Sequence, residues 1–247
     1  MPADVNQLRA VIARADRHQE LLSAALLKLE DRISDLMASA PLRDGDLFDL
    51  EWALAARVEL REAIEQEYLA TVDSIVREYA VVANEALVML KTYGDVTKID
   101  PAIISQLQSF TFQGFDDLGQ NFLDAVSKEL YESTLTGTSF ANSLSTIKQS
   151  VDASLGRYAK QALHDGLMQF DASINTKLAL DAGATEFKYY GPDDSATRDF
   201  CQKHVGKTYT KEEIEEIWSG SWAGKISGDP FIVRGGYNCR HRFRGIF

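Results

Sequence analysis

Residues 8–36, LRAVIARADRHQELLSAALLKLEDRISDL, decide the class of fold. Apolar side chains recur in this stretch at alternating spacings of four and three residues, which keeps them on one face of a helix. That apolar face consists of Leu8, Ile12, Ala15, Leu22, Leu26, Leu29, Ile33 and Leu36. The spacing predicts one amphipathic helix of about nine turns.

A second long helix is expected after a short break. Pro41 and the turn residues Asp44-Gly45-Asp46 interrupt the first helix, because proline cannot continue its hydrogen bonds and glycine favours a turn. The same apolar spacing returns from Tyr68 to Met89. Two long helices with a short connection predict an antiparallel hairpin on the order of 50 Å long. We expect the two faces to pack on each other. The alternative is that part of the apolar stripe contacts another subunit.

Three more helices are predicted in the middle of the chain, over about 101–110, 116–136 and 139–182. Asp100-Pro101 is typical of a helix start, with an N-cap followed by proline at the first helical position. Ser139 is a suitable cap for the last helix, which we expect to break near Gly156.

The character of the sequence changes after Gly183. Eight of the sixteen glycines lie from Gly191 onward, and apolar residues come in short runs such as 231–233, FIV, which favour strands and turns. One helix is expected near 210–218, where Thr210 and Glu213 form a capping-box pattern. The predicted fold is therefore mainly α with a small α+β part. We expect three domains: a helical hairpin over 1–92, a helical middle over 93–185 and a glycine-rich α+β module over 186–247.

The charge is unevenly distributed along the chain. The formal charge is −11; residues 1–180 hold 27 acidic and 16 basic side chains, whereas residues 181–247 hold ten of each. An acidic body disfavours general nucleic-acid binding. The first residues lack the pattern of a secretory signal, and the most apolar stretch, 79–90, is too short for a membrane span. We therefore expect synthesis in the cytoplasm and no membrane association.

Two cysteine–histidine pairs lie in the module: Cys201-x-x-His204 and Cys239-x-His241. Residues i and i+3 share a face of a helical turn, and residues i and i+2 share a face of a strand, so that each pair could chelate one ion. Two thiolates and two imidazoles form a closed tetrahedral zinc site, which is structural because no position stays open for a substrate. The alternative is a pair of small buried thiols with locally hydrogen-bonded histidines.

Four arginines lie near the end of the chain, where residues 231–247 contain no acidic side chain. Arg234, Arg240, Arg242 and Arg244 could bind phosphates, since a guanidinium pairs bidentately with them. They could equally pair with the acidic helical part of the same chain or of a neighbour. Protein contact is the favoured interpretation, and a short, local DNA contact remains the alternative.

Three segments of the module resemble one known family. Residues 194–198, DSATR, residues 201–209, CQKHVGKTY, and residues 235–241, GGYNCRH, are similar to the C-terminal signature of the phage minor head proteins, the Mu F-like head morphogenesis group. The resemblance covers about 55 residues. Gly235-Gly236 and His241 stand where other members carry His-Pro and a second cysteine.

The resemblance implies a non-enzymatic virion protein that is made in the host cytoplasm and acts in head assembly beside the portal. It further implies portal or capsid proteins as partners, an oligomeric or assembly-bound state, and a part in DNA packaging or ejection. The motif residues would then be architectural, with Asp194 and Arg198 orienting one another. The full motif set is Asp194, Thr197, Arg198, Gly206, Gly235, Gly236, Asn238 and Arg240.

Within this set, the two adjacent glycines would permit a tight turn whose backbone Asn238 satisfies. Two other classes of function remain open. One is a metal-dependent nucleic-acid-processing enzyme that uses the Cys/His cluster, and the other is a free-standing dimer formed through the hairpin.

Overall fold

The computed structural model describes residues 2–43, 47–91, 100–136, 139–150 and 156–247. Its contacts divide the chain into two compact units. The first unit comprises Met1–Arg17, Glu78–Gln108 and Leu163–Phe247, and the second comprises His18–Arg77 and Ser109–Ala162. Both units are assembled from segments far apart in the sequence, and the three-domain division stays a prediction. No helix within the described residues combines the length and apolar content needed to cross a bilayer.

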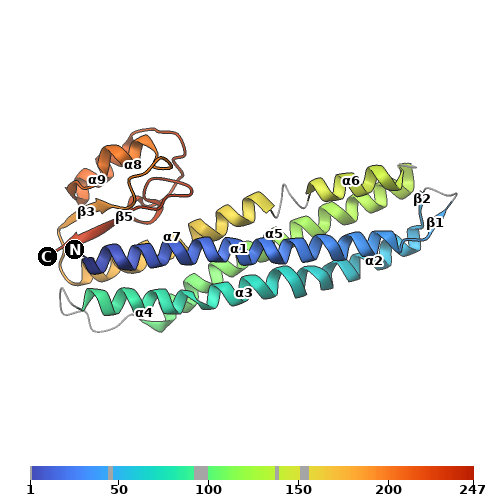
Figure 1. The fold of residues 1–247 in the computed structure, drawn as a ribbon, viewed down its shortest axis with the longest axis horizontal. Coiled ribbons are helices and arrows are strands. Elements are labelled where there is room, and N and C mark those ends of the chain that lie inside the picture. The colour runs from blue at the N-terminus through green and yellow to red at the C-terminus, as the bar shows by residue number, and fades with distance from the viewer. Residues whose placement is uncertain (1, 44–46, 92–99, 137–138, 151–155) are drawn as a thin grey trace. The chain divides into compact units, whose positions relative to one another are not determined.

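The predicted long first helix is confirmed as α1 (Pro2–Ala38), which contributes residues to both units (Figure 1). Two short strands, β1 (Leu42–Arg43) and β2 (Leu47–Phe48), pair antiparallel after it. The expected second helix consists of four consecutive helical pieces. They are α2 (Leu50–Ala63), the π-helical turn η1 (Ile64–Leu69), α3 (Ala70–Arg77) and α4 (Tyr79–Leu90).

The helices of the middle region are α5 (Pro101–Thr136), α6 (Phe140–Ser150) and α7 (Tyr158–Asp181). The predicted N-cap is confirmed, since Asp100 Oδ1 accepts from the backbone N–H of Ala102 at 2.9 Å. The predicted break between 110 and 116 is wrong, because α5 continues through the exposed Gly114. One glycine costs a helix only about 1 kcal/mol, which packing elsewhere offsets. Most of the segment expected to break near Gly156 lies outside the described residues.

Each unit has its own apolar packing. In the first unit, Leu8, Val11 and Ala15 of α1 join buried side chains of α4 and α7 in one cluster. Tyr79 and Phe170 meet there with ring centroids 4.8 Å apart. In the second unit α5 approaches the π-helical turn closely at Gly119, where an added Cβ would lie 3.2 Å from Ile64.

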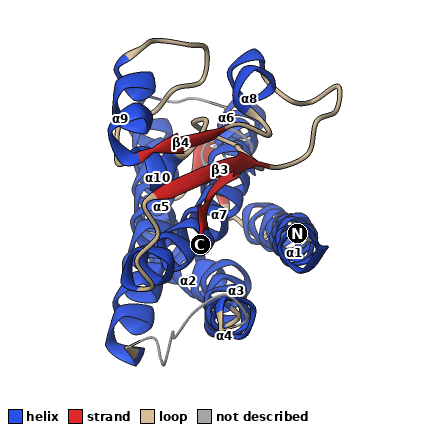
Figure 2. Cartoon of the chain, turned by 90° about the vertical axis from the view of Figure 1, so that its left-hand side faces the viewer, coloured by secondary structure: helices blue, strands red, loops and turns tan. Residues whose placement is uncertain are grey.

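The C-terminal module, residues 186–247, contains a small antiparallel sheet with the strand order β4-β3-β5 (Figure 2). The strands are β3 (Glu186–Tyr190), β4 (Thr208–Thr210) and β5 (Arg242–Ile246). Three short helices accompany them: α8 (Asp199–His204), α9 (Lys211–Ser219) and α10 (Pro230–Val233). These elements confirm a mainly α fold with a small α+β part.

Two details of the module test the expectations for its local structure. The capping box is confirmed, with Glu213 N–H donating to Thr210 Oγ1 and Thr210 N–H donating to the Glu213 carboxylate. The reading of 231–233 as a strand is wrong, because these residues belong to α10. Asp229 caps that helix through the N–H of Phe231 at 2.8 Å, and Pro230 occupies its first turn.

Candidate metal centre

Two cysteines and one histidine bring their donor atoms together inside the C-terminal module. Cys201 lies on α8, and Cys239 and His241 lie just before β5; each residue is only 2% exposed. The two Sγ atoms are 3.9 Å apart, and Cys239 Sγ lies 3.9 Å from His241 Nδ1. The three donor atoms all lie within 4.8 Å of one another, so this group could hold a metal ion.

Gly235 makes the close approach of the sulfur atoms possible. Its backbone N–H donates to Cys239 Sγ at 3.3 Å. A Cβ added at Gly235 would lie 2.6 Å from Cys201 Sγ and 3.0 Å from Cys239 Sγ, closer than real Cβ contacts. Any residue larger than glycine at position 235 would therefore fill the space between the donor atoms.

His204, the fourth predicted ligand, is not part of this group. Its side chain is buried at the end of α8, and its Nδ1 lies 2.7 Å from the hydroxyl of Tyr209 on β4. Burial, together with the positive charges of Lys203 and Lys207, lowers the pKa of His204. The C-x-x-H spacing does place Cys201 and His204 on one short helix, but the imidazole of His204 contacts Tyr209 of the neighbouring strand instead of the thiols.

Tyr189 occupies the place beside the two thiols, and sequence reasoning missed it. Its hydroxyl lies 3.3 Å from Cys201 Sγ and 3.6 Å from Cys239 Sγ. Its ring stacks on His241, with centroids 5.3 Å apart and planes at 10°. The available signal was the period-two pattern of β3, in which Phe187 and Tyr189 are the two buried positions.

The group has an asymmetric electrostatic environment. Hydrogen bonding to Cys239 and burial hold the pKa of the Cys201 thiol well above its usual value. Burial alone would raise the pKa of Cys239 as well, but hydrogen bonds with Cys201 and His241 and the charge of Arg234 lower it. Burial, with the nearby thiols, raises the pKa of Tyr189. Cys239 is therefore the thiol most readily ionised.

Among the motif residues, Arg198 contacts backbone rather than Asp194. Its guanidinium donates to the carbonyl oxygens of Gly235 at 2.6 Å, Gly224 at 3.3 Å and Tyr237 at 2.5 Å. The expectation that Asp194 and Arg198 orient one another is therefore corrected. A single arginine instead connects two loops of the module.

Asp194 pairs with Arg240, whose two terminal nitrogens both donate to the carboxylate. These hydrogen bonds outweigh desolvation and lower the pKa of Asp194 to about 2. Thr197 closes the same loop, since its hydroxyl donates to Pro192 O and accepts from Asp194 N–H, both at 3.0 Å.

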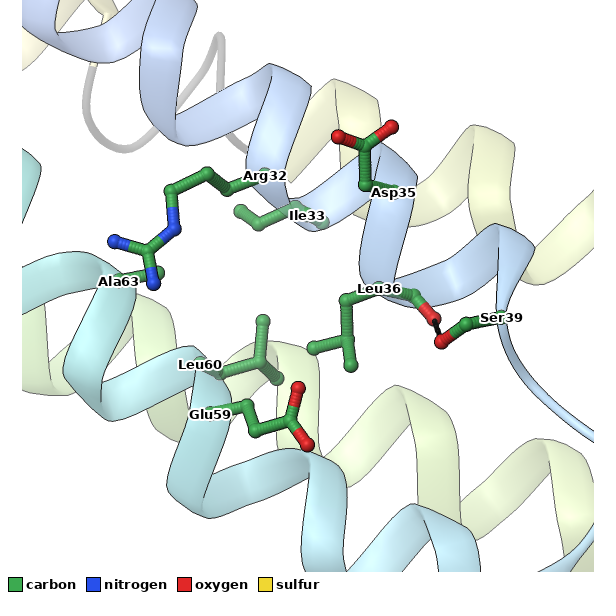
Figure 3. Close-up of a pocket in the computed structure, with 8 residues that line it drawn as sticks. All are labelled: Arg32, Ile33, Asp35, Leu36, Ser39, Glu59, Leu60 and Ala63. Carbon is green, nitrogen blue, oxygen red and sulfur yellow. Dashed lines mark hydrogen bonds between the residues drawn. The ribbon is translucent and has the colours of Figure 1, made fainter.

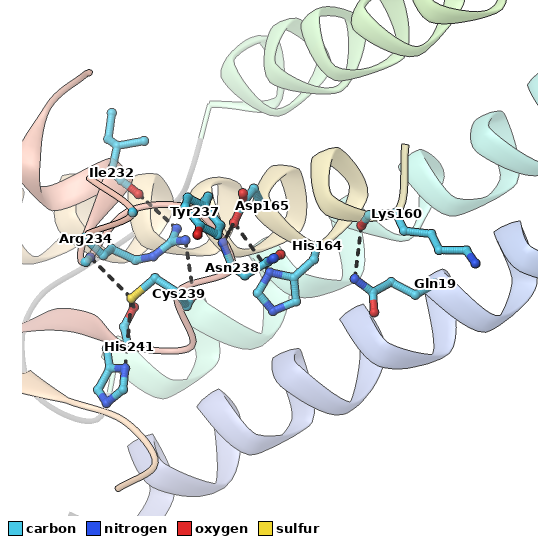
Figure 4. A network of polar contacts seen from close by, with 12 residues as sticks. Gln19, Lys160, His164, Asp165, Ile232, Arg234, Tyr237, Asn238, Cys239 and His241 are labelled. Carbon is cyan, nitrogen blue, oxygen red and sulfur yellow. Dashed lines mark hydrogen bonds and ion pairs between the residues drawn. The ribbon is translucent and has the colours of Figure 1, made fainter. Parts of the chain in front are cut away.

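The turn residues of the motif have left-handed backbones. Gly206 and Gly236 have φ of 83° and 107°, and Asn238 has φ of 52°. The expected tight turn is therefore present at Gly236, whereas Gly235 serves close approach. Asn238 N–H donates to Asp165 of α7 at 2.7 Å, which attaches this turn to the helix (Figure 4).

Two of the four C-terminal arginines have buried side chains, and the alternative of a DNA contact stays a prediction. Arg234 is 0% exposed and donates to the carbonyl oxygens of Ile232 and Cys239 at 2.9 and 3.2 Å (Figure 4). Arg242 is 1% exposed and forms an ion pair with Asp171 of α7. The aspartate partner of Arg242 is 71 residues away in the sequence, whereas both carbonyl partners of Arg234 lie within five residues of it.

The remaining two arginines differ in their setting. Arg240 is occupied by the carboxylate of Asp194, and Arg244 is half-buried on β5. The favoured interpretation, contact with acidic protein groups, therefore describes Arg240 and Arg242 within this chain.

Three of the hollows that the described residues form lie away from the Cys/His group. A hollow of about 320 Å³ between α1 and α2 has an apolar base, Leu36 and Leu60, and a rim that includes Arg32 and Glu59 (Figure 3). An open, mostly apolar groove of about 600 Å³ lies between α1 and α4. A third, of about 340 Å³, lies beside α8 and is lined by His204 among other residues. None of these hollows contains the donor atoms of the Cys/His group.

Comparisons of this chain with protein-family models, with curated proteins and with solved structures find no match. Its function is therefore inferred from its own residues and their geometry.

Proposed function

We propose that this chain is a structural virion protein of a bacteriophage, a minor head protein that acts in capsid assembly beside the portal. The observation that carries this proposal is that the residues of the head-protein signature form the internal contacts of the C-terminal module. Arg198 binds three carbonyl oxygens, and Asp194 pairs with Arg240. Signature residues that form internal contacts keep the C-terminal module rigid, and a rigid module suits a contact in an assembly.

On this proposal the protein is synthesised in the host cytoplasm and is carried in the virion in small copy number. From its place beside the portal it assists DNA packaging or ejection. The acidic body favours a position next to packaged DNA without extensive binding to it.

The helical hairpin is the part that we propose docks on the portal or capsid. Leu50, Leu54 and Val58 of α2 are 47%, 54% and 61% exposed. A spacing of four residues places them along one face of that helix. Contiguous exposed apolar side chains indicate a protein-contact surface, and this stripe supports docking through α2.

We propose zinc as the ion of the Cys/His group, with a structural role. Thiolate and imidazole donors together favour Zn²⁺ over the oxygen-seeking cations. All three donors are buried, which suits an ion that contributes folding energy rather than one that meets a substrate. The alternative function, a metal-dependent nucleic-acid-processing enzyme, needs an accessible metal and free arginines, and the burial of Arg234 and Arg242 disfavours it.

The test is recovery of the protein from phage particles produced by its native source. Particles are separated on a density gradient, and the chain is quantified by mass spectrometry against the major shell protein. We expect it in the particle fractions at a small fraction of the shell protein's abundance. A chain found only in the soluble fractions would overturn the proposal.

A matched pair of variants connects this test to the module. Arg198→Ala removes the arginine that connects two loops, whereas Lys203→Ala removes an exposed cation from α8, the helix that begins directly after Arg198. Arg198→Ala should reduce incorporation into particles by at least tenfold, while Lys203→Ala should leave it unchanged. Equal incorporation of the two variants would mean that the module is dispensable for assembly.

A further inference from the structure

We infer that the hydroxyl oxygen of Tyr189, and not His204, is the fourth ligand of a zinc ion held by Cys201, Cys239 and His241. This assignment rests on the proposal that the Cys/His group holds zinc. It changes the composition of the site from two sulfurs and two nitrogens to two sulfurs, one nitrogen and one oxygen.

Four distances between the donor atoms are close to the edges of a tetrahedron around zinc. Bonds of about 2.3 Å to sulfur and 2.0 Å to nitrogen or oxygen give edges of about 3.8 Å for S–S and about 3.5 Å for both S–N and S–O. The corresponding distances are 3.9 Å between the sulfurs, 3.9 Å from Cys239 Sγ to His241 Nδ1, and 3.3 and 3.6 Å from the sulfurs to Tyr189 Oη. The tyrosine oxygen therefore lies where a fourth ligand belongs.

The backbone at Gly235 independently marks the space that these donors surround. A Cβ added there would lie 2.6 Å from Cys201 Sγ, 3.0 Å from Cys239 Sγ and 3.0 Å from Tyr189 Oη. One missing methyl group would thus contact two sulfurs and the tyrosine oxygen together. His204 is not among these contacts, because Tyr209 engages its Nδ1.

Charge provides a second reason. Arg234 is fully buried beside Cys239 and donates to carbonyl oxygens; among the described residues it forms no ion pair with a carboxylate. Zinc with two thiolates, one phenolate and a neutral imidazole carries a net charge of −1, which Arg234 would neutralise. A phenolate ligand adds one released proton per zinc to those that the thiols release.

The experiment uses the full chain, freed of metal by a chelator and titrated with zinc chloride. Proton release is measured in weak buffer, and affinity is measured by competition with a chromophoric chelator. Tyr189→Phe should release one proton fewer per zinc than the wild type, with an affinity lower by about 10- to 100-fold. Tyr209→Phe, which deletes a hydroxyl from the adjacent strand, and His204→Ala should both behave like the wild type.

X-ray absorption of the zinc-loaded wild type identifies the ligands directly, so this test does not depend on whether a variant folds. We expect two sulfur neighbours, two nitrogen or oxygen neighbours and the multiple scattering of a single imidazole, with one light neighbour lost or lengthened in Tyr189→Phe. Two sulfurs with the multiple scattering of two imidazoles, or a wild-type proton count in Tyr189→Phe, would overturn the assignment while leaving the zinc proposal intact. A wild type that binds no zinc would overturn both, whereas failure of particle association would leave the ligand assignment standing.

Discussion

Replacing Arg242 with methionine tests whether a buried ion pair attaches the C-terminal strand to the helical part of the first unit. Arg242 on β5 and Asp171 on α7 are 1% and 0% exposed and are 71 residues apart in the sequence. Asp171 also accepts from Gln7 at 3.0 Å and from Asn175 at 2.9 Å. The aspartate thus joins α1, α7 and β5, and its strongest donor is the arginine.

The expected cost follows from this burial. Methionine retains an unbranched apolar side chain but leaves the Asp171 carboxylate buried with only two neutral donors. Removing one partner of a buried pair costs about 3–5 kcal/mol, because the remaining charge is uncompensated. At roughly 2–4 °C per kcal/mol for a chain of this size, the melting temperature should fall by roughly 6–20 °C.

Urea denaturation followed by tryptophan fluorescence is a suitable assay, since Trp218 and Trp222 lie in the C-terminal module. Arg244→Met, two residues further along the same strand but half-buried, is the matched control and should cost less than about 1 kcal/mol. The double variant Asp171→Leu/Arg242→Met removes both charges and should recover most of the loss. Equal costs for Arg242→Met and Arg244→Met would refute the reasoning, because a buried pair cannot be lost as cheaply as a surface contact.

Three further perturbations have outcomes fixed by local geometry. Thr210→Ala should lower the free energy of unfolding by about 1 kcal/mol through loss of the capping box, measured by urea denaturation. The pKa of Asp194 is about 2 in the folded chain, below its unfolded value of about 3.9. The stability that Asp194 contributes is therefore present above about pH 4 and is lost between about pH 4 and 2. Arg240→Gln should flatten that part of a curve of stability against pH. Gly236→Ala should destabilise the fold by more than about 2 kcal/mol, since φ is 107° and the added Cβ would lie 1.9 Å from a carbonyl oxygen. Gly114→Ala, in open space on α5, should instead stabilise the fold by about 0.5–1 kcal/mol. Similar shifts in melting temperature for the two variants would contradict both expectations.

Local signals in the sequence predict the helical part well. The apolar spacing of residues 8–36 predicts α1, and Thr210 with Glu213 predicts the start of α9, because both signals act within a few residues. The error at 231–233 is also local. A run of three apolar residues resembles a strand, yet Asp229-Pro230 already carries the cap and first-turn proline of a helix.

The candidate site is predictable only in part, since its geometry depends on long-range contacts. The two cysteines, 38 residues apart, do meet, and spacing alone suggested them. Spacing could not show that His204 faces Tyr209, or that a tyrosine of β3 faces the thiols. Which side chain reaches the sulfurs is decided by the antiparallel pairing of β3 with β5, which sets Tyr189 opposite Phe243.

The same long-range contacts change the meaning of the charge distribution. A neutral module with four terminal arginines looks like a segment available to phosphates when only the sequence is read. In the folded chain, Asp165 and Asp171 of the acidic helical region instead hold the turn at Asn238 and the guanidinium of Arg242. Part of the acidic excess is therefore matched to this module, and Arg242 stabilises the fold through its ion pair with Asp171.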